Sequence, residues 1–113
     1  MSIKRIKTGA RMSEAVVHGS TVYLAGQVAK GEGVTAQTKA VLGQIDALLA
    51  EAGTDKTKIL SATIYLADIA TFGEMNAVWE AWVPQGNTPA RATLEAALAT
   101  SDYKVEIVVV AAV

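Results

Sequence analysis

Cysteine is absent from this 113-residue sequence, which excludes disulfide bonds, thiolate nucleophiles and zinc sites built on cysteine. Histidine occurs once, and we find no cluster of metal-ligating residues, no serine-hydrolase motif and no phosphate-binding loop. The first ten residues, MSIKRIKTGA, lack the apolar segment of a signal peptide, and no apolar run is long enough to cross a bilayer. We therefore expect a cytoplasmic protein that contacts no membrane and uses no metal or other cofactor.

Charged residues are scarce as well, at 19% of the chain against 51% hydrophobic residues, a balance typical of a folded globular protein. The length favours one domain that spans residues 1–113. The net charge of −1 gives no support to nucleic-acid binding, because proteins that bind it usually carry a pronounced basic surface. We interpret the basic residues near the start as solvated surface: Lys4, Arg5, Lys7 and Arg11.

The spacing of apolar residues predicts secondary structure in the order β-β-β-α-β-α-β-β. Strands are expected at residues 2–7, within 14–28 on both sides of a Gly19-Ser20 turn, and at 58–68, 90–98 and 104–112. The first helix is expected at 34–53, because apolar residues recur there at spacings of three and four and Gly53 is a typical helix end.

The second helix is expected to begin at Thr71, which has the spacing of a capping box with Glu74, and to end before Pro84. Its expected buried stripe consists of Phe72, Met75, Trp79 and Trp82. Both helices are amphipathic, so they can cover one face of a mixed sheet and give an α+β fold, a two-layer sandwich. The last strand, KVEIVVVAAV, is apolar on both sides, so we expect another copy of the chain to cover the second face.

Two charged residues stand out in the last two strands. Arg91 alternates with small apolar residues in PARATLEA, and Glu106 shares a strand face with Val108 and Val110. A structural ion pair between neighbouring strands would explain both residues. They would equally suit a site for a small carboxylate, because the guanidinium fork binds a carboxylate with two hydrogen bonds and a glutamate among apolar residues can hold or donate a proton.

The runs PARATLEA, KVEIVVVAAV, YLAGQV (23–28) and FGEMNAVWEAWV (72–83) resemble the RidA/YjgF family, also labelled endoribonuclease L-PSP, and within it the short YoaB-like branch. The similarity extends over nearly all of residues 3–113. It implies a chorismate-mutase-like fold assembled as a homotrimer, with three sites in the clefts between subunits. It also implies hydrolysis of reactive 2-enamine or 2-imine acids, such as 2-aminoacrylate, to 2-keto acids and ammonia.

The resemblance assigns roles to individual residues. Arg91 corresponds to the arginine that holds the substrate carboxylate, and Glu106 to the glutamate that positions or activates water. Gly26 and Asn76 correspond to residues that line the cleft, and Thr93 stands where the family often has cysteine. Two further departures are Met12 and Ala25, which replace a tyrosine and a serine and leave the preferred substrate open.

We therefore expect a deaminase in which Arg91 and Glu106 are catalytic and Arg91, Gly26, Asn76 and Thr93 bind substrate. One alternative is a non-catalytic protein that binds small 2-keto or other carboxylic acids in the same cleft. The family label suggests RNA cleavage as another, which the acidic balance and the single histidine disfavour.

Overall fold

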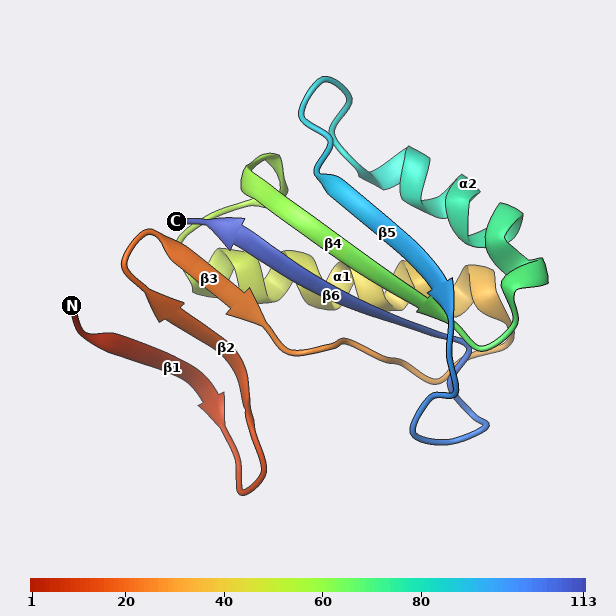
Figure 1. Cartoon of the computed structure of the whole chain (residues 1–113), viewed down its shortest axis with the longest axis horizontal. Helices are drawn as coiled ribbons and strands as arrows, with labels where there is room; N and C mark the ends of the chain where they lie inside the picture. Colours follow the sequence, from red (N-terminus) through yellow and green to blue (C-terminus); the bar gives the residue numbers. More distant parts are fainter.

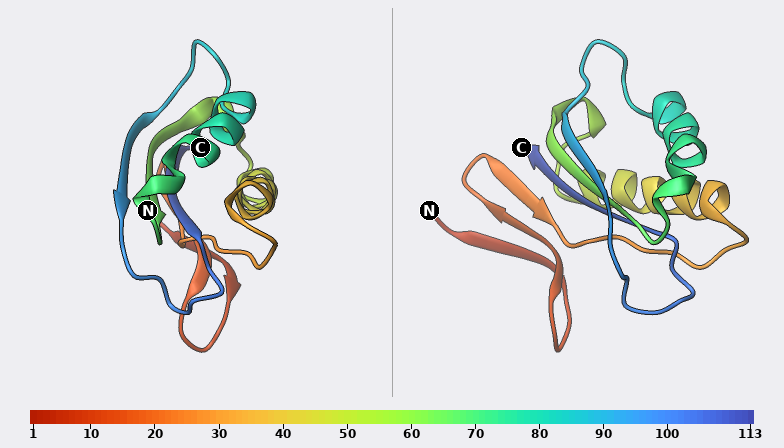
Figure 2. Two further views of the ribbon diagram at one scale, coloured as in Figure 1. Left: turned by 90° about the vertical axis from the view of Figure 1, so that its right-hand side faces the viewer. Right: turned by 45° about the vertical axis from the view of Figure 1, so that its right-hand side comes forward.

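The computed structural model describes residues 1–113 and contains one six-stranded sheet with two helices on one of its faces (Figures 1 and 2). The elements are β1 (Ile3–Thr8), β2 (Ser13–His18), β3 (Thr21–Leu24), α1 (Val34–Glu51), β4 (Ile59–Leu66), α2 (Phe72–Trp82), β5 (Ala90–Glu95) and β6 (Val105–Ala112). Two short 3₁₀ turns, η1 (Lys56–Lys58) and η2 (Ile69–Thr71), precede β4 and α2. The predicted α+β fold and its element order are confirmed.

The sheet has the order β1-β2-β3-β6-β4-β5, so the last strand of the chain lies near its centre. β5 runs parallel to β4, and every other neighbouring pair is antiparallel. Gly19 has a φ of 62° in the two-residue connection between β2 and β3, as the sequence predicted for that turn. β5 is therefore an edge strand, with β4 between it and β6.

The core lies between the sheet and the helices. Alternate residues of β6, among them Ile107 and Val109, are fully buried on the helix side, and Leu42, Ile45 and Leu49 of α1 pack into the same cluster. Every second side chain of a strand points to the same face of the sheet, and every third or fourth side chain of a helix points to the same side of the helix. These two apolar surfaces pack against each other to form the core. Neither helix is long and apolar enough to cross a membrane.

The opposite face of the sheet has no helix over it; the edge-on view at the left of Figure 2 shows both helices on one side only. Large side chains on this bare face are exposed, with Tyr23 at 51%, Leu60 at 52% and Leu94 at 41%. Val108 and Val110 of β6 lie between them and are half-buried by their neighbours alone. The bare face is thus an apolar surface within a single chain.

A buried glutamine connects α1 to the segment that enters β6. The Gln37 amide nitrogen donates to the carbonyls of Gly31 and Asp102 at 3.2 and 2.9 Å, and its oxygen accepts from the Lys104 N–H at 2.7 Å. Gln37 is fully buried, so these hydrogen bonds satisfy a side chain that would otherwise destabilise the core. They hold the start of β6 in place, two residues before Glu106.

Two sequence expectations for α2 are wrong. Thr71 does not cap the helix with its side chain, because its hydroxyl donates to the Asp68 carbonyl at 2.6 Å and thereby closes the 3₁₀ turn η2. The expected buried stripe is only half correct: Met75 and Trp79 are buried, while Phe72 is 37% exposed and Trp82 is half-buried. α2 lies near the β5 edge of the sheet, beyond which no further strand can cover its side chains (Figure 1).

We predict opposite stability changes for two glycine-to-alanine substitutions in and after α1. Gly53 has a φ of 85° just past the helix end, so Gly53→Ala should lower the free energy of unfolding by about 1 kcal/mol. Gly43 lies within the helix with open space around an added Cβ, so Gly43→Ala should raise it by about 0.5–1 kcal/mol. Urea unfolding at one protein concentration measures both, and equal effects of the two substitutions would contradict the assignment of the helix end.

Candidate functional site

Arg91 is held in one orientation at the edge of the sheet. Its side chain lies on the helix side of β5, where the guanidinium carbon is 5.7 Å from the ring centroid of Phe72 and 5.5 Å from that of Trp79. Its Nη1 donates to Oδ1 of Asn76 at 2.7 Å. Stacking on aromatic faces and one hydrogen bond fix the plane of the guanidinium while using only one of its five N–H donors.

Asn76 is oriented in turn by its own helix. Its amide nitrogen donates to Oε1 of Glu80, one turn further along α2, at 3.2 Å, which directs the amide oxygen toward Arg91. The structure thus places Asn76 beside Arg91, whereas the sequence resemblance implied only a position near the cleft. Phe72 and Trp79, which the sequence suggested only as core, complete this arginine half-site, defined as Arg91, Asn76, Phe72 and Trp79.

Thr93 lies two residues after Arg91 on the same side of β5. Its hydroxyl oxygen is buried and has no hydrogen-bond partner in the structure. A buried hydroxyl without a partner destabilises a fold by about 1–3 kcal/mol. Thr93 is therefore a polar group next to the arginine half-site whose hydrogen bonds the chain itself does not satisfy.

Glu106 belongs to the bare face of the sheet. It pairs with Tyr65 of the neighbouring β4 and is half-buried. A hollow of about 250 Å³ opens beside it, lined by Tyr65, Val108 and residues 96–98 of the connection that follows β5. The carboxylate thus lies on an open, mainly apolar surface.

Gly26 leaves room for the Glu106 carboxylate. A Cβ atom built on Gly26 would lie 2.9 Å from Cδ of Glu106 and would overlap its Oε2, so no larger residue fits without displacing the carboxylate.

Gln27 holds Gly26 in this position, because its backbone exchanges two hydrogen bonds with Ile107, at 2.9 and 3.1 Å. The Gln27 side chain donates to Oε1 of Glu14 and to the Ala25 carbonyl, each at 3.0 Å. We define Glu106, Gly26 and Tyr65 as the glutamate half-site.

The two half-sites do not meet within one chain, and the interpretation of Arg91 and Glu106 as an ion pair between neighbouring strands is wrong. Arg91 pairs with Ala62 on the helix side, whereas Glu106 pairs with Tyr65 on the bare side. β4 also lies between their two strands. The sheet itself separates the guanidinium from the carboxylate.

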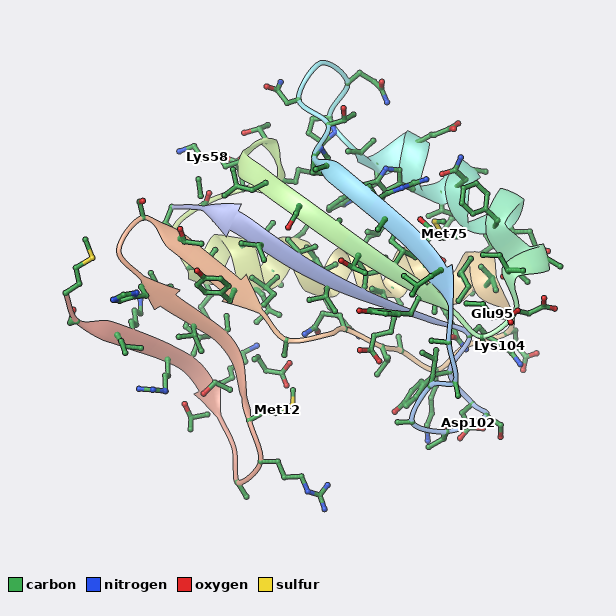
Figure 3. The ribbon with its side chains drawn as sticks, viewed as in Figure 1. Met12, Lys58, Met75, Glu95, Asp102 and Lys104 are labelled. Carbon is green, nitrogen blue, oxygen red and sulfur yellow. The ribbon has the colours of Figure 1, made fainter.

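Two of the residues that depart from the family pattern, Met12 and Ala25, lie near Gly26 of the glutamate half-site. Met12 is 49% exposed in the loop between β1 and β2, far from α2 in Figure 3, and borders a hollow of about 460 Å³ together with Glu14 and Gly26. Ala25 directly precedes Gly26 and its N–H donates to the Glu14 carbonyl at 2.9 Å.

No group of three or more histidine, aspartate or glutamate side chains is arranged to hold a metal ion. Sequence reasoning missed Gln27, although its place within YLAGQV beside Gly26 was the available signal.

The fold and the half-sites define a small α+β protein with a fixed guanidinium at one sheet edge and a carboxylate on a bare sheet face. The family model Endoribonuclease L-PSP matches residues 2–113, so the chain belongs to that family, which includes the RidA and YjgF proteins. It is 47% identical over 115 residues to the RutC family protein YoaB of Escherichia coli K12, covering 100% of both chains. A YjgF-family crystal structure from Neisseria meningitidis superposes with a TM-score of 0.97 at 48% identity, covering 99% of this chain and 95% of that chain.

A more distant relative has a named activity. The chain is 34% identical over 107 residues to a protein of Rattus norvegicus named 2-iminobutanoate/2-iminopropanoate deaminase, covering 88% of this chain and 77% of the relative.

We predict that Gly26 and Glu106 are energetically coupled. Gly26→Ala should lower the free energy of unfolding by about 0.5–1 kcal/mol, because the added methyl displaces the end of a flexible, half-buried side chain. In a Glu106→Ala background the same change should have a smaller effect, with a coupling energy of about 0.5 kcal/mol. Gly31→Ala, whose nearest neighbouring atom would be 3.6 Å away, is the control. Additive effects of the two substitutions in denaturant unfolding would show that Gly26 does not accommodate Glu106.

Proposed function

We propose that this protein is an imine deaminase that hydrolyses 2-imino acids, and the enamines in equilibrium with them, to 2-keto acids and ammonia. The observation that carries this proposal is the fixed guanidinium of Arg91, which presents free N–H donors at a sheet edge to a planar carboxylate. The name of the rat relative supports the substrate class. Nothing in this reaction requires a metal or redox group, because a protonated imine is already electrophilic.

We further propose that the complete site forms between two copies of the chain in a homotrimer. Arg91 and Glu106 lie on opposite sides of one sheet, so a small substrate can reach both only if they come from different subunits. The exposed Tyr23, Leu60 and Leu94 support this arrangement, because an apolar sheet face of this kind is typical of a buried subunit interface. A closed ring of three copies uses the same pair of surfaces three times and gives three equivalent sites.

In the proposed mechanism, Arg91 of one subunit binds the substrate carboxylate with two hydrogen bonds and so aligns the C=N bond. The Thr93 hydroxyl, which has no partner in the chain, offers a further hydrogen bond there. Glu106 of the neighbouring subunit takes a proton from a water molecule as its oxygen bonds to the imine carbon, which gives a carbinolamine. The same carboxyl returns the proton to nitrogen and then accepts the proton of the new hydroxyl group. The C–N bond breaks as the C–O bond becomes a carbonyl, so ammonia leaves and the keto acid remains.

A non-catalytic carboxylate-binding protein would use the same arginine half-site. Met12 and Ala25 favour this second candidate, because both lack a hydroxyl that could orient water beside Gly26. Binding of pyruvate without any turnover of imine distinguishes it from the deaminase. Cleavage of RNA has less support, because the chain has a net charge of −1 and a single histidine.

Conservative substitutions of the two charged residues test the proposed roles. Arg91→Lys should lower kcat/KM by about thirty- to a hundredfold, which corresponds to a loss of about 2–3 kcal/mol in transition-state stabilisation. The reason is that one ammonium group cannot replace the bidentate hydrogen bonding of a guanidinium to a carboxylate. Glu106→Gln should preserve pyruvate binding and abolish most turnover, because an amide cannot carry the proton. The assay follows imines generated in situ by an amino-acid oxidase.

The matched controls are Arg11→Lys and Glu51→Gln, which change exposed residues of the same types and should retain full activity. The melting temperatures of all four variants show whether a loss of activity comes from a catalytic defect or from a less stable fold. Activity per folded protein at the wild-type level in Glu106→Gln would exclude the proton-transfer role.

Mixing two inactive variants tests the shared site. Co-expressed Arg91→Ala and Glu106→Gln chains should recover about a quarter of wild-type activity. Each site needs an intact Arg91 from one subunit and an intact Glu106 from its neighbour, and in a random mixture each of these is present in about half of the cases. Neither variant alone should be active, and light scattering should give the mass of three chains. A monomer at micromolar concentration, or mixtures as inactive as their parents, would contradict the inter-subunit site.

A further inference from the structure

The outer surface between α1 and α2 contains a groove that is separate from both half-sites. It has a volume of about 700 Å³, within the range of small-molecule sites, and α1 and α2 form its two walls. Leu42 of α1 and Val78 and Ala81 of α2 provide the apolar part of its lining. Because α2 turns Asn76 and Trp79 toward Arg91, the groove and the arginine half-site use different sides of the same helix.

One end of the groove is closed by a fixed aromatic wall. The Trp82 indole N–H donates to Oδ2 of Asp46 at 2.9 Å, which joins the end of α2 to the middle of α1. Trp79 packs against the Trp82 ring at 5.5 Å with an interplanar angle of 47°. Trp82 is half-buried, so one part of its ring remains available to the groove.

At the Trp82 end the groove presents the Lys56 ammonium, and the Asp46 carboxylate at this end already accepts the Trp82 indole N–H. The Lys56 ammonium lies 5.0 Å from the centroid of the Trp82 ring, and Lys39 also lines the groove. Glu74, the one acidic lining residue, precedes Trp82 by eight positions, which is about 12 Å along a helix. An apolar floor with the ammonium of a partly buried lysine at one end complements a molecule with an apolar body and one terminal negative charge.

We propose that this groove binds a free monocarboxylic acid with an apolar chain of medium length. Its carboxylate lies against the Lys56 ammonium beside Trp82, and its chain lies over Leu42, Val78 and Ala81. The stretch of α1 from Lys39 to Asp46, about 10 Å by helical rise, sets the length of chain that the groove covers. The site is independent of the 2-imino acid reaction, because none of its lining residues belongs to either half-site.

The test is a titration of the full-length protein with octanoate, octanol and octylamine, followed by tryptophan fluorescence and calorimetry. Octanoate should bind saturably with one molecule per chain, and octylamine should bind at least tenfold more weakly because it repels Lys56. Lys56→Ala should weaken octanoate binding about tenfold or more, the loss expected for a charge-assisted hydrogen bond, and Lys56→Arg should largely restore it. Lys58→Ala, in the same 3₁₀ turn but outside the groove, is the matched control and should bind as wild type does.

Two further variants locate the ligand. Ala77→Phe fills the groove and should abolish octanoate binding, whereas Ala50→Phe, at an exposed site of α1 outside it, should not. Arg91→Ala should bind octanoate normally while losing imine hydrolysis, so failure of the groove proposal and failure of the deaminase proposal are distinguishable. Absence of saturable binding, equal binding of octylamine, or loss of binding in Arg91→Ala would overturn the proposal. Dissociation of the oligomer by Ala77→Phe would overturn it as well, because the groove would then be a contact between copies.

Discussion

The two-residue period of the strands decides on which side of the sheet each of the two charged residues lies. In β5 it turns Arg91 toward the helices, and in β6 it turns Glu106 away from them. The hydrogen-bonded register with β4 fixes both choices, because a shift by one residue would move every core side chain of the strand to the wrong face. The same register that buries Ile107 and Val109 therefore exposes Glu106, and the folding of the core and the division of the site are one constraint.

The position of each charged residue depends on uncharged neighbours. Arg91 has its plane set by Asn76 and by the rings of Phe72 and Trp79 on α2, which an edge strand alone would leave mobile. Glu106 has its space set by Gly26, whose position follows from the two backbone hydrogen bonds between Gln27 and Ile107. Rigid secondary structure thus supports both groups, as preorganised sites require.

Helix α2 has a wider role than covering the core. At the edge of the sheet it buries only Met75 and Trp79 fully, which leaves Trp82 half-buried against α1. One side of α2 orients Arg91, and the other side forms a wall of the groove beside Lys56. A helix centred over the sheet would have buried these side chains and formed neither surface.

The sequence by itself determined the order of the elements, the alternation of side chains along β5 and β6 and the resemblance that named the candidate residues, because periodicity and local motifs are properties of neighbouring positions. It also indicated a second apolar sheet face, since KVEIVVVAAV is apolar on both sides. Only the tertiary structure decided that Arg91 and Glu106 lie on opposite sides of the sheet, that Thr71 closes a 3₁₀ turn, and that Gln27 and the fully buried Gln37 hold distant segments in place. These outcomes depend on which strands become neighbours and where a helix ends over the sheet, and contacts between residues far apart in the chain leave no local pattern.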